Sequence, residues 1–534
     1  MDKRIAIIGA GMSGLAATRC ALLYGMTPVV FESAPAAGGL WLYKENVTDG
    51  PSVMRNTVTN TSKEMTAFSD FVPLKESPVF MNQREVYKYL MSYSDHNGLQ
   101  DHITFNTTVL AVRRSNDYAE TGTWIVEYKN KDAQRAESDV FDGVLFCTGH
   151  HSKPWRPLPW RNEKAFKGSI LHSIDYRNAE NFRNKTVVIV GFGNSAVDCA
   201  VDLSNVAKQV YLSTRRGAWL KPRTGRRGMP RDIARTRANY YKSKMIPDFI
   251  QTYSEEQMLQ QRLDHVSYGI APEHHVFSAH PTISDELPSK IASGLVIVKP
   301  NVEGFEPTSV EFDDGSIVQD VDAVILCTGF SFDFKILEGG NLVTVFPEND
   351  AHLYKLMYPT KLSDHNTLAM IGYVQPMGST FPVAEMQSRL FFSVLSGETK
   401  LPESADMIAE LEWHRCQLSL NYVKSRRHTM EVDFIAYMDD LAKLINARPN
   451  ICKLLTTDIR LALHVLFGPC TAYQYRLEGP NKWEGARDAI LNSGKRIFYP
   501  NSQDSSFGIL SQTFECLKNI LLILTVIVFY FYVF

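Results

Sequence analysis

The sequence predicts an α/β protein made of two doubly wound domains, the second inserted in the first, with a hydrophobic helix at the C-terminus. Three observations lead to this fold class. A glycine-rich turn between an apolar strand and a helix occurs twice, within residues 5–24 and 186–204. Each half then ends in an apolar strand that runs into Cys-Thr-Gly, at residues 147–149 and 327–329. The chain closes with an almost unbroken apolar stretch, residues 520–534.

Composition narrows the classes of function. At 534 residues and 44% hydrophobic content, the chain has room for two or three packed domains. Its formal net charge of -2 gives no global field that would attract nucleic acid, so nucleic acid is not an expected partner. Its eight cysteines lie far apart without a CxxC pair, which argues against a redox-active dithiol or a metal site. We expect reduced thiols in the cytosol.

The first glycine turn has the context of a dinucleotide-binding fingerprint. The strand 5–8 leads into Gly9-Ala10-Gly11-Met12-Ser13-Gly14, and a helical run follows. Gly9 permits the tight turn, Gly11 lets the backbone approach a pyrophosphate, and Gly14 lets the helix pack closely on the strand. The next strand ends at Glu32, whose carboxylate can accept hydrogen bonds from ribose hydroxyls. The turn therefore predicts a Rossmann-like nucleotide site.

The second glycine turn repeats this pattern with different residues at the ribose. Its core is Gly191-Phe192-Gly193-Asn194-Ser195-Ala196, between the strand 186–190 and a helical run. The position that corresponds to Glu32 is Thr214, and Arg215 and Arg216 follow it. Hydroxyl and guanidinium groups bind a 2'-phosphate, whereas a carboxylate would repel it. This copy should prefer NADPH to NADH, and two solvated arginines at a strand end are the alternative.

Two sites with opposite ribose chemistry imply two different nucleotides. NADPH is expected at the basic site and FAD at the acidic one, where Glu32 precedes Gly38-Gly39-Leu40-Trp41, a block that recurs in FAD proteins. The residues expected to bind FAD are Gly9, Gly11, Gly14, Glu32, Gly39, Leu40 and Trp41. The residues expected to bind NADPH are Gly191, Gly193, Asn194, Ser195, Ser213, Thr214 and Arg215.

A segment just before the second turn carries a family signature. Residues 166–176 fit the pattern FxGxxxHxxxY, with His172 as the histidine. On this motif the chain resembles the flavin-containing monooxygenases, in particular the animal microsomal, dimethylaniline N-oxide-forming type. Four further stretches resemble the same branch, namely residues 59–65, 213–217, 280–285 and 468–487. The chain departs from the family at Cys147 and Cys327, where alanine is common.

The resemblance implies a reaction and a catalytic residue. NADPH would reduce FAD, oxygen would add to the reduced flavin at C4a, and the hydroperoxide would oxygenate nitrogen or sulfur in small lipophilic amines and sulfides. The flavin carries this chemistry, so the protein needs no acid-base triad. The family comparison places Asn60 beside the flavin as the catalytic residue and adds Asn60 and Thr61 to the cofactor contacts. By residue type alone, Asn60 would be a turn residue.

These assignments divide the chain into four parts. Residues 1–155 are expected to form the first part of the FAD-binding domain. Residues 156–330 would form the NADPH-binding domain, with an inserted lid or membrane-associated segment at about 217–290. Residues 331–505 would complete the FAD-binding domain and the substrate channel, and 506–534 would anchor the chain in a membrane.

Two features within these parts leave alternatives open. His172 is expected to make a domain-linking hydrogen bond near the NADPH site, in preference to transferring a proton. The basic, helix-like stretch from Arg223 to Lys244 would rest on anionic lipid, belong to an active-site lid or expose a solvated helix face.

The apolar tail sets the expected location. As a helix rising ~1.5 Å per residue, residues 520–534 would reach roughly 22 Å, short of the ~30 Å hydrocarbon core. The tail would therefore span a thin bilayer or insert partway, and a buried core helix is the alternative. We expect attachment to the endoplasmic reticulum membrane through lipid contacts, with the catalytic domains facing the cytosol. A homo-oligomer is left open.

Other functions share parts of this design. The same flavin chemistry would permit Baeyer-Villiger oxygenation of ketones, or an NADPH oxidase activity that releases hydrogen peroxide. An NADPH-dependent disulfide reductase also has two fingerprints, but it needs a dithiol at the flavin, and the sequence has no CxxC. A membrane-tethered redox sensor would bind both nucleotides without oxygenating anything. Products from an amine, a thioether and a ketone distinguish these possibilities.

Overall fold

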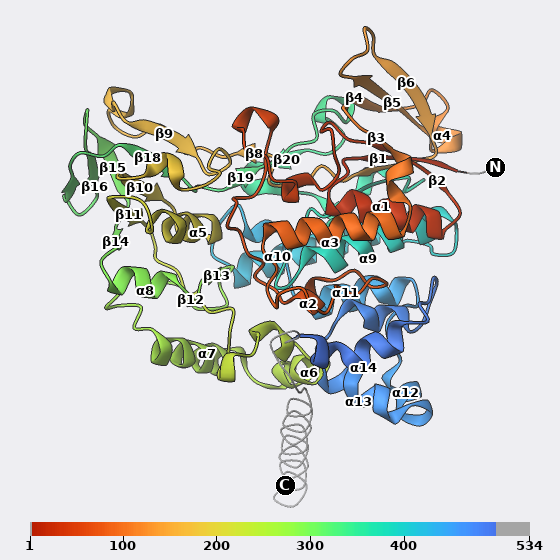
Figure 1. Cartoon of the computed structure of the whole chain (residues 1–534). Coiled ribbons are helices and arrows are strands. Elements are labelled where there is room, and N and C mark those ends of the chain that lie inside the picture. The colour runs from red at the N-terminus through yellow and green to blue at the C-terminus, as the bar shows by residue number, and fades with distance from the viewer. Residues whose placement is uncertain (1–2, 498–534) are drawn as a thin grey trace, which may run out of the picture.

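Two parallel sheets organise the molecule. The computed structural model describes residues 3–497, and within them each of the two large sheets has five strands. One sheet lies at the right of Figure 1 around β1 and the other at the left around β10. The predicted membrane anchor, residues 506–534, lies outside the described residues.

The first sheet has the strand order β24-β7-β1-β2-β3, and all its neighbours pair in parallel. In this order its strands span Leu368–Met370, Gly143–Phe146, Arg4–Ile8, Thr27–Phe31 and Ile103–Thr104. The second sheet has the order β14-β11-β10-β18-β9 and is also parallel. Its strands span Val296–Lys299, Gln209–Ser213, Thr186–Val190, Ala323–Leu326 and Ser169–His172.

The two sheets are versions of one design. β10 lies between β11 and β18 just as β1 lies between β2 and β7. A small antiparallel sheet precedes the closing strand in both halves: β4-β5-β6 before β7, and β15-β16-β17 before β18. These strands span Thr107–Arg114, Trp124–Asn130 and Glu137–Phe141 in the first half, and Val302–Phe305, Val310–Phe312 and Ile317–Val318 in the second. All strands of the second sheet lie between β7 and β24 in the chain, so it is inserted in the first.

The helices after the glycine turns begin earlier than the apolar runs suggest. α1 spans Met12–Leu23 and α5 spans Asn194–Leu203, whereas the sequence pattern placed their starts at residues 15 and 197. The second fingerprint glycine is the N-cap in both cases, so the rest of the glycine motif already belongs to the helix. The predicted strand at 186–190 is confirmed to the residue, and β2 ends directly before Glu32, as predicted.

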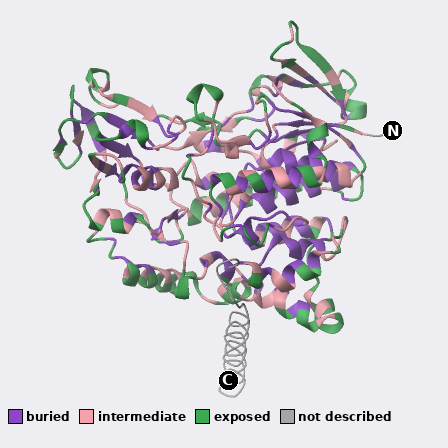
Figure 2. Cartoon of the chain, in the orientation of Figure 1, coloured by how far each residue is buried: buried purple, intermediate pink, exposed green. Residues whose placement is uncertain are grey.

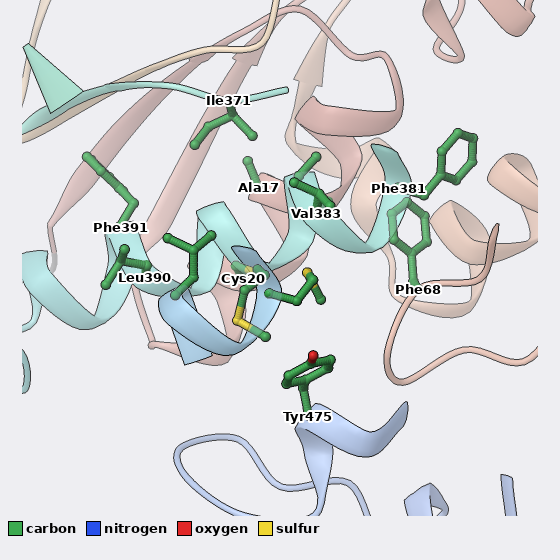
Figure 3. Packing of buried hydrophobic residues seen from close by; sticks show 14 of the residues in the cluster. Ala17, Cys20, Phe68, Ile371, Phe381, Val383, Leu390, Phe391 and Tyr475 are labelled. Atoms are coloured by element: carbon green, nitrogen blue, oxygen red, sulfur yellow. The ribbon is translucent and has the colours of Figure 1, made fainter. Parts of the chain in front are cut away.

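The largest core lies between the first sheet and the helices beneath it. α1 packs against α9 (Thr380–Leu395), and nearly all of α9 is buried. Its buried polar residues have partners in the core, as Glu385 pairs with Arg476, and Figure 2 shows this central layer in the buried colour. Figure 3 shows Ala17 and Cys20 of α1 among Leu390 and Phe391 of α9, with Tyr475 approaching from the C-terminal part of the chain.

The C-terminal part folds back under this core. It contains α10 (Ser404–Asn421), α11 (Phe434–Leu444), α12 (Ile451–Thr457), α13 (Ile459–Phe467) and α14 (Ala486–Ile497). α14 packs against α2 (Lys63–Thr66), so the end of the described chain lies against the segment that follows Asn60. In the described range, 3–497, no helix is both long enough and apolar enough to cross a membrane.

The inserted segment is less helical than predicted. Between Arg223 and Lys244 the structure has two short 3-10 turns, and the α-helix begins only at Arg237, as α6 (Arg237–Met245). Arg237 is buried and pairs with Asp439, with Nη1 and Oδ2 2.6 Å apart. The alternative of a wholly solvated basic face is therefore wrong for this residue. The next helix, α7 (Asp248–Arg262), is largely exposed (Figure 2).

Candidate functional site

One cavity joins the carboxyl ends of both parallel sheets. Its volume is about 1380 Å3, and both glycine turns form part of its wall. Every predicted site residue lines this cavity except Gly14: Gly9, Gly11, Glu32, Gly39, Leu40, Trp41, Asn60, Thr61, Gly191, Gly193, Asn194, Ser195, Ser213, Thr214 and Arg215. The structure thus brings both predicted nucleotide sites and Asn60 to a single continuous space, where ligands of open α/β sheets usually bind.

Gly14 lies behind the cavity wall and has a packing role. A Cβ atom on Gly14 would come within 1.9 Å of the Gly9 carbonyl oxygen, so no side chain fits there. The second turn has a buried alanine, Ala196, at the matching position. Glycine is thus required at this position only in the first turn.

The first glycine of each turn meets the Cys-Thr-Gly segment of the same sheet. Gly9 and Gly191 have φ angles of 101° and 120°, which favour glycine. Their missing Cβ atoms would lie 2.8 Å and 2.5 Å from the carbonyl oxygens of Cys147 and Cys327. The contact is with the backbone of the Cys-Thr-Gly segment, so it does not depend on the cysteine side chain.

The N-terminus of α1 has the features of an anion-binding site. Its N-cap, Gly11, provides no side-chain cap, so the amides of the first turn remain available to a ligand. The backbone of Gly39 passes close by, since a Cβ atom on Gly39 would lie 3.0 Å from the Cα atom of Gly11. The glycine backbones at Gly11 and Gly39 thus border the same part of the cavity, and neither carries a side chain that would block a ligand.

Glu32 is buried at the end of β2 and braces the turn itself. One carboxylate oxygen accepts a hydrogen bond from the Ala10 amide at 2.7 Å, and the other accepts from the Ala34 amide at 2.8 Å. A carboxylate has about four lone-pair sites, so these bonds leave acceptors for ribose hydroxyls. Sequence reasoning predicted the ribose contact but not the bracing of the turn.

The basic residues of the second site face the cavity without partners. Arg215 and Arg216 are exposed, line the cavity, and have no ion pair or side-chain hydrogen bond within residues 3–497. Thr214 is buried at the base of this segment, and its hydroxyl accepts a hydrogen bond from the Gly217 amide at 3.0 Å. Two unpaired guanidinium groups at a cavity wall suit a 2'-phosphate.

Asn60 lies on a short loop before α2. Its side chain lines the cavity and has no hydrogen-bond partner among the described residues. The loop around it is fixed: the Thr59 hydroxyl donates to the Thr61 carbonyl at 2.9 Å, and the Thr61 and Thr66 hydroxyls are 2.8 Å apart. The loop therefore presents a free amide from a fixed backbone.

Distant segments hold this loop from two sides. Asp232 of the inserted segment accepts hydrogen bonds from the amide and hydroxyl of Ser62, at 2.6 Å and 3.0 Å. On the other side, Arg496 of α14 makes a two-pronged ion pair with the buried Glu64, at 2.8 Å and 2.7 Å. The Asn60 loop is thus positioned by residues that are far from it in the sequence.

His172 makes two hydrogen bonds to backbone. Its Nε2 atom lies 3.0 Å from the Gly329 carbonyl oxygen, and its Nδ1 atom accepts from the Ile174 amide at 3.2 Å. Burial lowers the pKa of His172, which favours the neutral ring that this pattern requires. Gly329 follows β18, which pairs with β9 at His172, so this bond joins neighbouring strands of the second sheet, and a domain-linking role for His172 stays a prediction.

Several cavity residues were not found from the sequence. The N-terminus of α9 faces the cavity through Gly378, Ser379 and Thr380, and Gly372 lies against α1, where its Cβ atom would come within 2.4 Å of Ser13 Oγ. Arg427 approaches the second turn from the C-terminal part. The sequence Gly378-Ser379 is typical of a helix start and could have indicated where α9 begins. The cavity that this helix start faces could not be predicted, because it depends on contacts between remote segments.

Comparison with known proteins identifies the family. A family described as flavin-binding monooxygenase-like matches residues 2–534. The chain belongs to this family. It is 44% identical over 501 residues to flavin-containing monooxygenase 5 of Rattus norvegicus, with 93% of each chain covered. It is 37% identical over 536 residues to dimethylaniline monooxygenase [N-oxide-forming] 2 of Mus musculus, with 100% of this chain and 99% of the relative covered.

Solved structures agree on the fold of this flavin monooxygenase. The S-allyl-L-cysteine S-oxygenase of Allium sativum has a TM-score of 0.63 at 22% identity, covering 93% of this chain and 99% of its own. The open structure of cyclohexanone monooxygenase has a TM-score of 0.60 at 13% identity, covering 83% and 97%. The α/β fold with Rossmann-type domains, predicted from the glycine turns, is confirmed.

FAD and NADPH are the cofactors of this family, and the cavity fits both. The acidic side offers an uncapped helix start, the Gly11 and Gly39 backbones and a buried carboxylate. The basic side offers a second uncapped helix start at Gly193 together with the free Arg215 and Arg216. Opposite charges at the two ribose positions suit two nucleotides that differ in a 2'-phosphate.

Proposed function

We propose that this flavin monooxygenase uses NADPH and oxygen to oxygenate nitrogen or sulfur in small lipophilic amines and sulfides. One observation carries the proposal: both glycine turns and the free Asn60 amide line the same cavity. Two nucleotides bound at these turns would share that space with a substrate. The name of the Mus musculus relative, for N-oxide formation from dimethylaniline, supports an amine as substrate.

In this proposal the first glycine turn binds FAD and the second binds NADPH. Bound FAD would supply the activation of oxygen, which no side chain can perform alone. The residues that would hold it are Gly9, Gly11, Glu32, Gly39, Leu40, Trp41 and Thr61, while Gly14 would act indirectly, by letting α1 pack on its strand. NADPH would be held by Gly191, Gly193, Asn194, Ser195, Ser213, Thr214 and Arg215. Arg216 would add charge beside the 2'-phosphate.

Asn60 is the proposed catalytic residue. Its amide can donate and accept hydrogen bonds, and no described residue satisfies either group. The fixed loop would hold it toward the oxygen being transferred and the retained nicotinamide. Preorganised donors of this kind stabilise developing charge without the cost of reorientation.

Exclusion of water is the second task of the chain. Reducing equivalents are lost as hydrogen peroxide when water and protons reach the flavin too early. The loop that follows Asn60 is held by the Asp232 contacts on one side and by the Glu64–Arg496 pair on the other. These contacts would keep this part of the cavity wall in place and so limit the entry of water.

We also propose that residues 506–534 anchor the chain in the endoplasmic reticulum membrane, with the catalytic domains in the cytosol. The tail continues from α14, which lies at the lower side of Figure 1 near α6 and α13. That side also exposes Met245, Phe249 and Tyr253, at 85%, 74% and 65% of their surface. Apolar side chains in such exposure suit a lipid surface. The domain limits given from the sequence and the possible homo-oligomer stay predictions.

Product analysis tests the proposed reaction. The full chain in detergent is supplied with NADPH and oxygen and with an amine, a thioether or a ketone. We expect an N-oxide and a sulfoxide, with the ketone unchanged. An ester from the ketone would establish Baeyer-Villiger chemistry instead, and NADPH oxidation that yields only hydrogen peroxide would establish an oxidase.

A pair of asparagine variants makes this test specific to the site. Asn60→Ala should lower product formation about 100-fold, the effect of losing one positioned donor. Asn46→Ala removes an exposed asparagine whose side chain contacts only Asp49, outside the cavity wall, and should leave the rate unchanged. Equal rates for wild type and Asn60→Ala would remove Asn60 from the mechanism.

A further inference from the structure

Arg427 lies at the point where the second glycine turn leaves room for a ligand. If Gly193 carried a Cβ atom, that atom would lie 3.2 Å from Nη1 of Arg427. Gly193 is the second glycine of its fingerprint, the position whose missing side chain lets the backbone approach a diphosphate. Arg427 lines the same cavity, so its guanidinium borders the space that the diphosphate would occupy.

The guanidinium of Arg427 has no ion-pair or hydrogen-bond partner in the described part of the chain. Burial lowers the pKa of Arg427, and the charge of Glu431 acts against this by raising it. Two fully buried arginines do have carboxylate partners: Arg237 pairs with Asp439, and Arg476 pairs with Glu385, with Nη2 and Oε1 2.9 Å apart. Arg427 is half-buried, and a bound anion would stabilise a cation that is partly withdrawn from water without such a partner.

The groups around Arg427 leave its guanidinium unpaired. Glu431 pairs with His280, whose Nδ1 atom lies 2.7 Å from its Oε1, and burial raises the pKa of this carboxyl to about 8. Burial lowers the pKa of His280 and of His428. Within the described part of the chain, the donors of Arg427 therefore remain open to an anionic ligand.

Remote segments fix the backbone beside Arg427. His428 accepts a hydrogen bond from the His280 amide at its Nε2 atom, 3.1 Å away. The following strand, β26 (Glu431–Val432), pairs with β25 (Gln375–Pro376), close to the first sheet. Arg427 thus extends to the second nucleotide turn from a segment anchored near the first.

We infer that Arg427 binds the diphosphate of NADPH and completes the anion site at the start of α5. The N-cap of α5, Gly193, offers no side-chain cap, and the Asn194 side-chain oxygen is already occupied, since it accepts from the Ile283 amide at 2.8 Å. The α5 amides and the guanidinium would bind the diphosphate from two sides. This inference rests on the proposed assignment of the second turn to NADPH.

Different arginines would then recognise the two phosphate groups of NADPH that matter here, the 2'-phosphate and the diphosphate. Arg215 and Arg216 would recognise the 2'-phosphate, which NADPH has and NADH lacks. Arg427 would recognise the diphosphate, which both nucleotides have. Loss of Arg427 should therefore weaken both nucleotides equally, whereas loss of Arg215 should weaken only the phosphorylated one.

Calorimetric titration of the full, FAD-loaded chain tests this separation. The ligands are NADP+, NAD+ and adenosine 2'-monophosphate, which has the 2'-phosphate but no diphosphate. Arg427→Gln should weaken NADP+ and NAD+ by the same factor, about 10- to 100-fold, as expected for one charge-assisted hydrogen-bonding group. It should leave adenosine 2'-monophosphate unchanged, and Arg427→Lys should recover part of the affinity. Arg215→Ala should give the opposite pattern.

Two controls keep the result interpretable. Arg460→Gln removes the same charge from an exposed position on α13 and should bind all three ligands as wild type does. FAD content and melting temperature show whether each variant is folded. Unchanged NADP+ affinity in a folded Arg427→Gln variant, or an equal loss for adenosine 2'-monophosphate, would overturn the inference alone. Failure of wild type to bind NADP+ would overturn the proposed function itself.

Discussion

At the scale of single residues, Glu32 shows how one side chain serves both fold and ligand. Its two oxygens accept hydrogen bonds from the amides of Ala10 and Ala34, and thereby hold the glycine turn against the end of β2. The spacing in the sequence predicts a ribose-binding carboxylate. It does not predict the bracing bonds, because these depend on where the strand end meets the turn.

Replacement of this residue should therefore have two effects. Glu32→Ala removes the ribose acceptor and leaves two amides without partners, so we expect loss of FAD and a loss of about 1–3 kcal/mol in folding free energy for each buried amide. Flavin absorbance per chain and chemical denaturation measure the two effects. A variant that retains a full complement of FAD would contradict the assignment.

Glu431 makes stability depend on pH. Burial raises its pKa from 4.5 to about 8, so between these values the folded chain binds a proton that the unfolded chain does not. Stability from this group therefore falls as pH rises through that window. Glu431→Gln should remove the effect, so its melting temperature should exceed that of wild type by more at about pH 9 than at about pH 5. A constant difference would show that Glu431 does not titrate there.

At the scale of elements, the third glycine of each turn gives a matched pair of tests. Gly14→Ala places a Cβ atom 1.9 Å from the Gly9 carbonyl oxygen, so α1 must move away from its strand. We expect a colourless or insoluble product, because that displacement also opens the FAD site.

The second turn supplies the control for this substitution. Ala196→Gly removes only a buried methyl group from α5 and adds the cost of glycine in a helix, about 1 kcal/mol. It should leave FAD bound and the fold intact. Equal yields of flavin-loaded protein from both variants would show that the close packing at Gly14 is not required.

The elements that the sequence predicts best are those set by local spacing. Strands β2, β10 and β11 and both glycine turns follow from short patterns around Gly9 and Gly191. The helix starts were misplaced by three residues, because the apolar run begins after the first turn of the helix. Arg427, Asp232 and the start of α9 were missed as site residues, because their positions depend on contacts between segments far apart in the chain.

At the scale of the whole molecule, the predicted anchor and the catalytic part should be separable. Deletion of residues 520–534 should shift the chain from the membrane fraction to the soluble fraction of a cell lysate. The rate of amine oxygenation per bound FAD should stay within about twofold of wild type, because all the predicted cofactor and catalytic residues lie between Gly9 and Arg215. Continued sedimentation with membranes would show that the exposed side chains of α6 and α7 suffice for attachment.

One cavity is proposed to bring a nicotinamide held at the second turn to a flavin held at the first. Anaerobic mixing of the FAD-loaded chain with NADPH, followed by flavin absorbance, measures whether hydride passes between them. The oxidised flavin band should be lost on mixing with NADPH and should return when oxygen is admitted. A chain that binds both nucleotides and yet keeps its oxidised flavin band would contradict it.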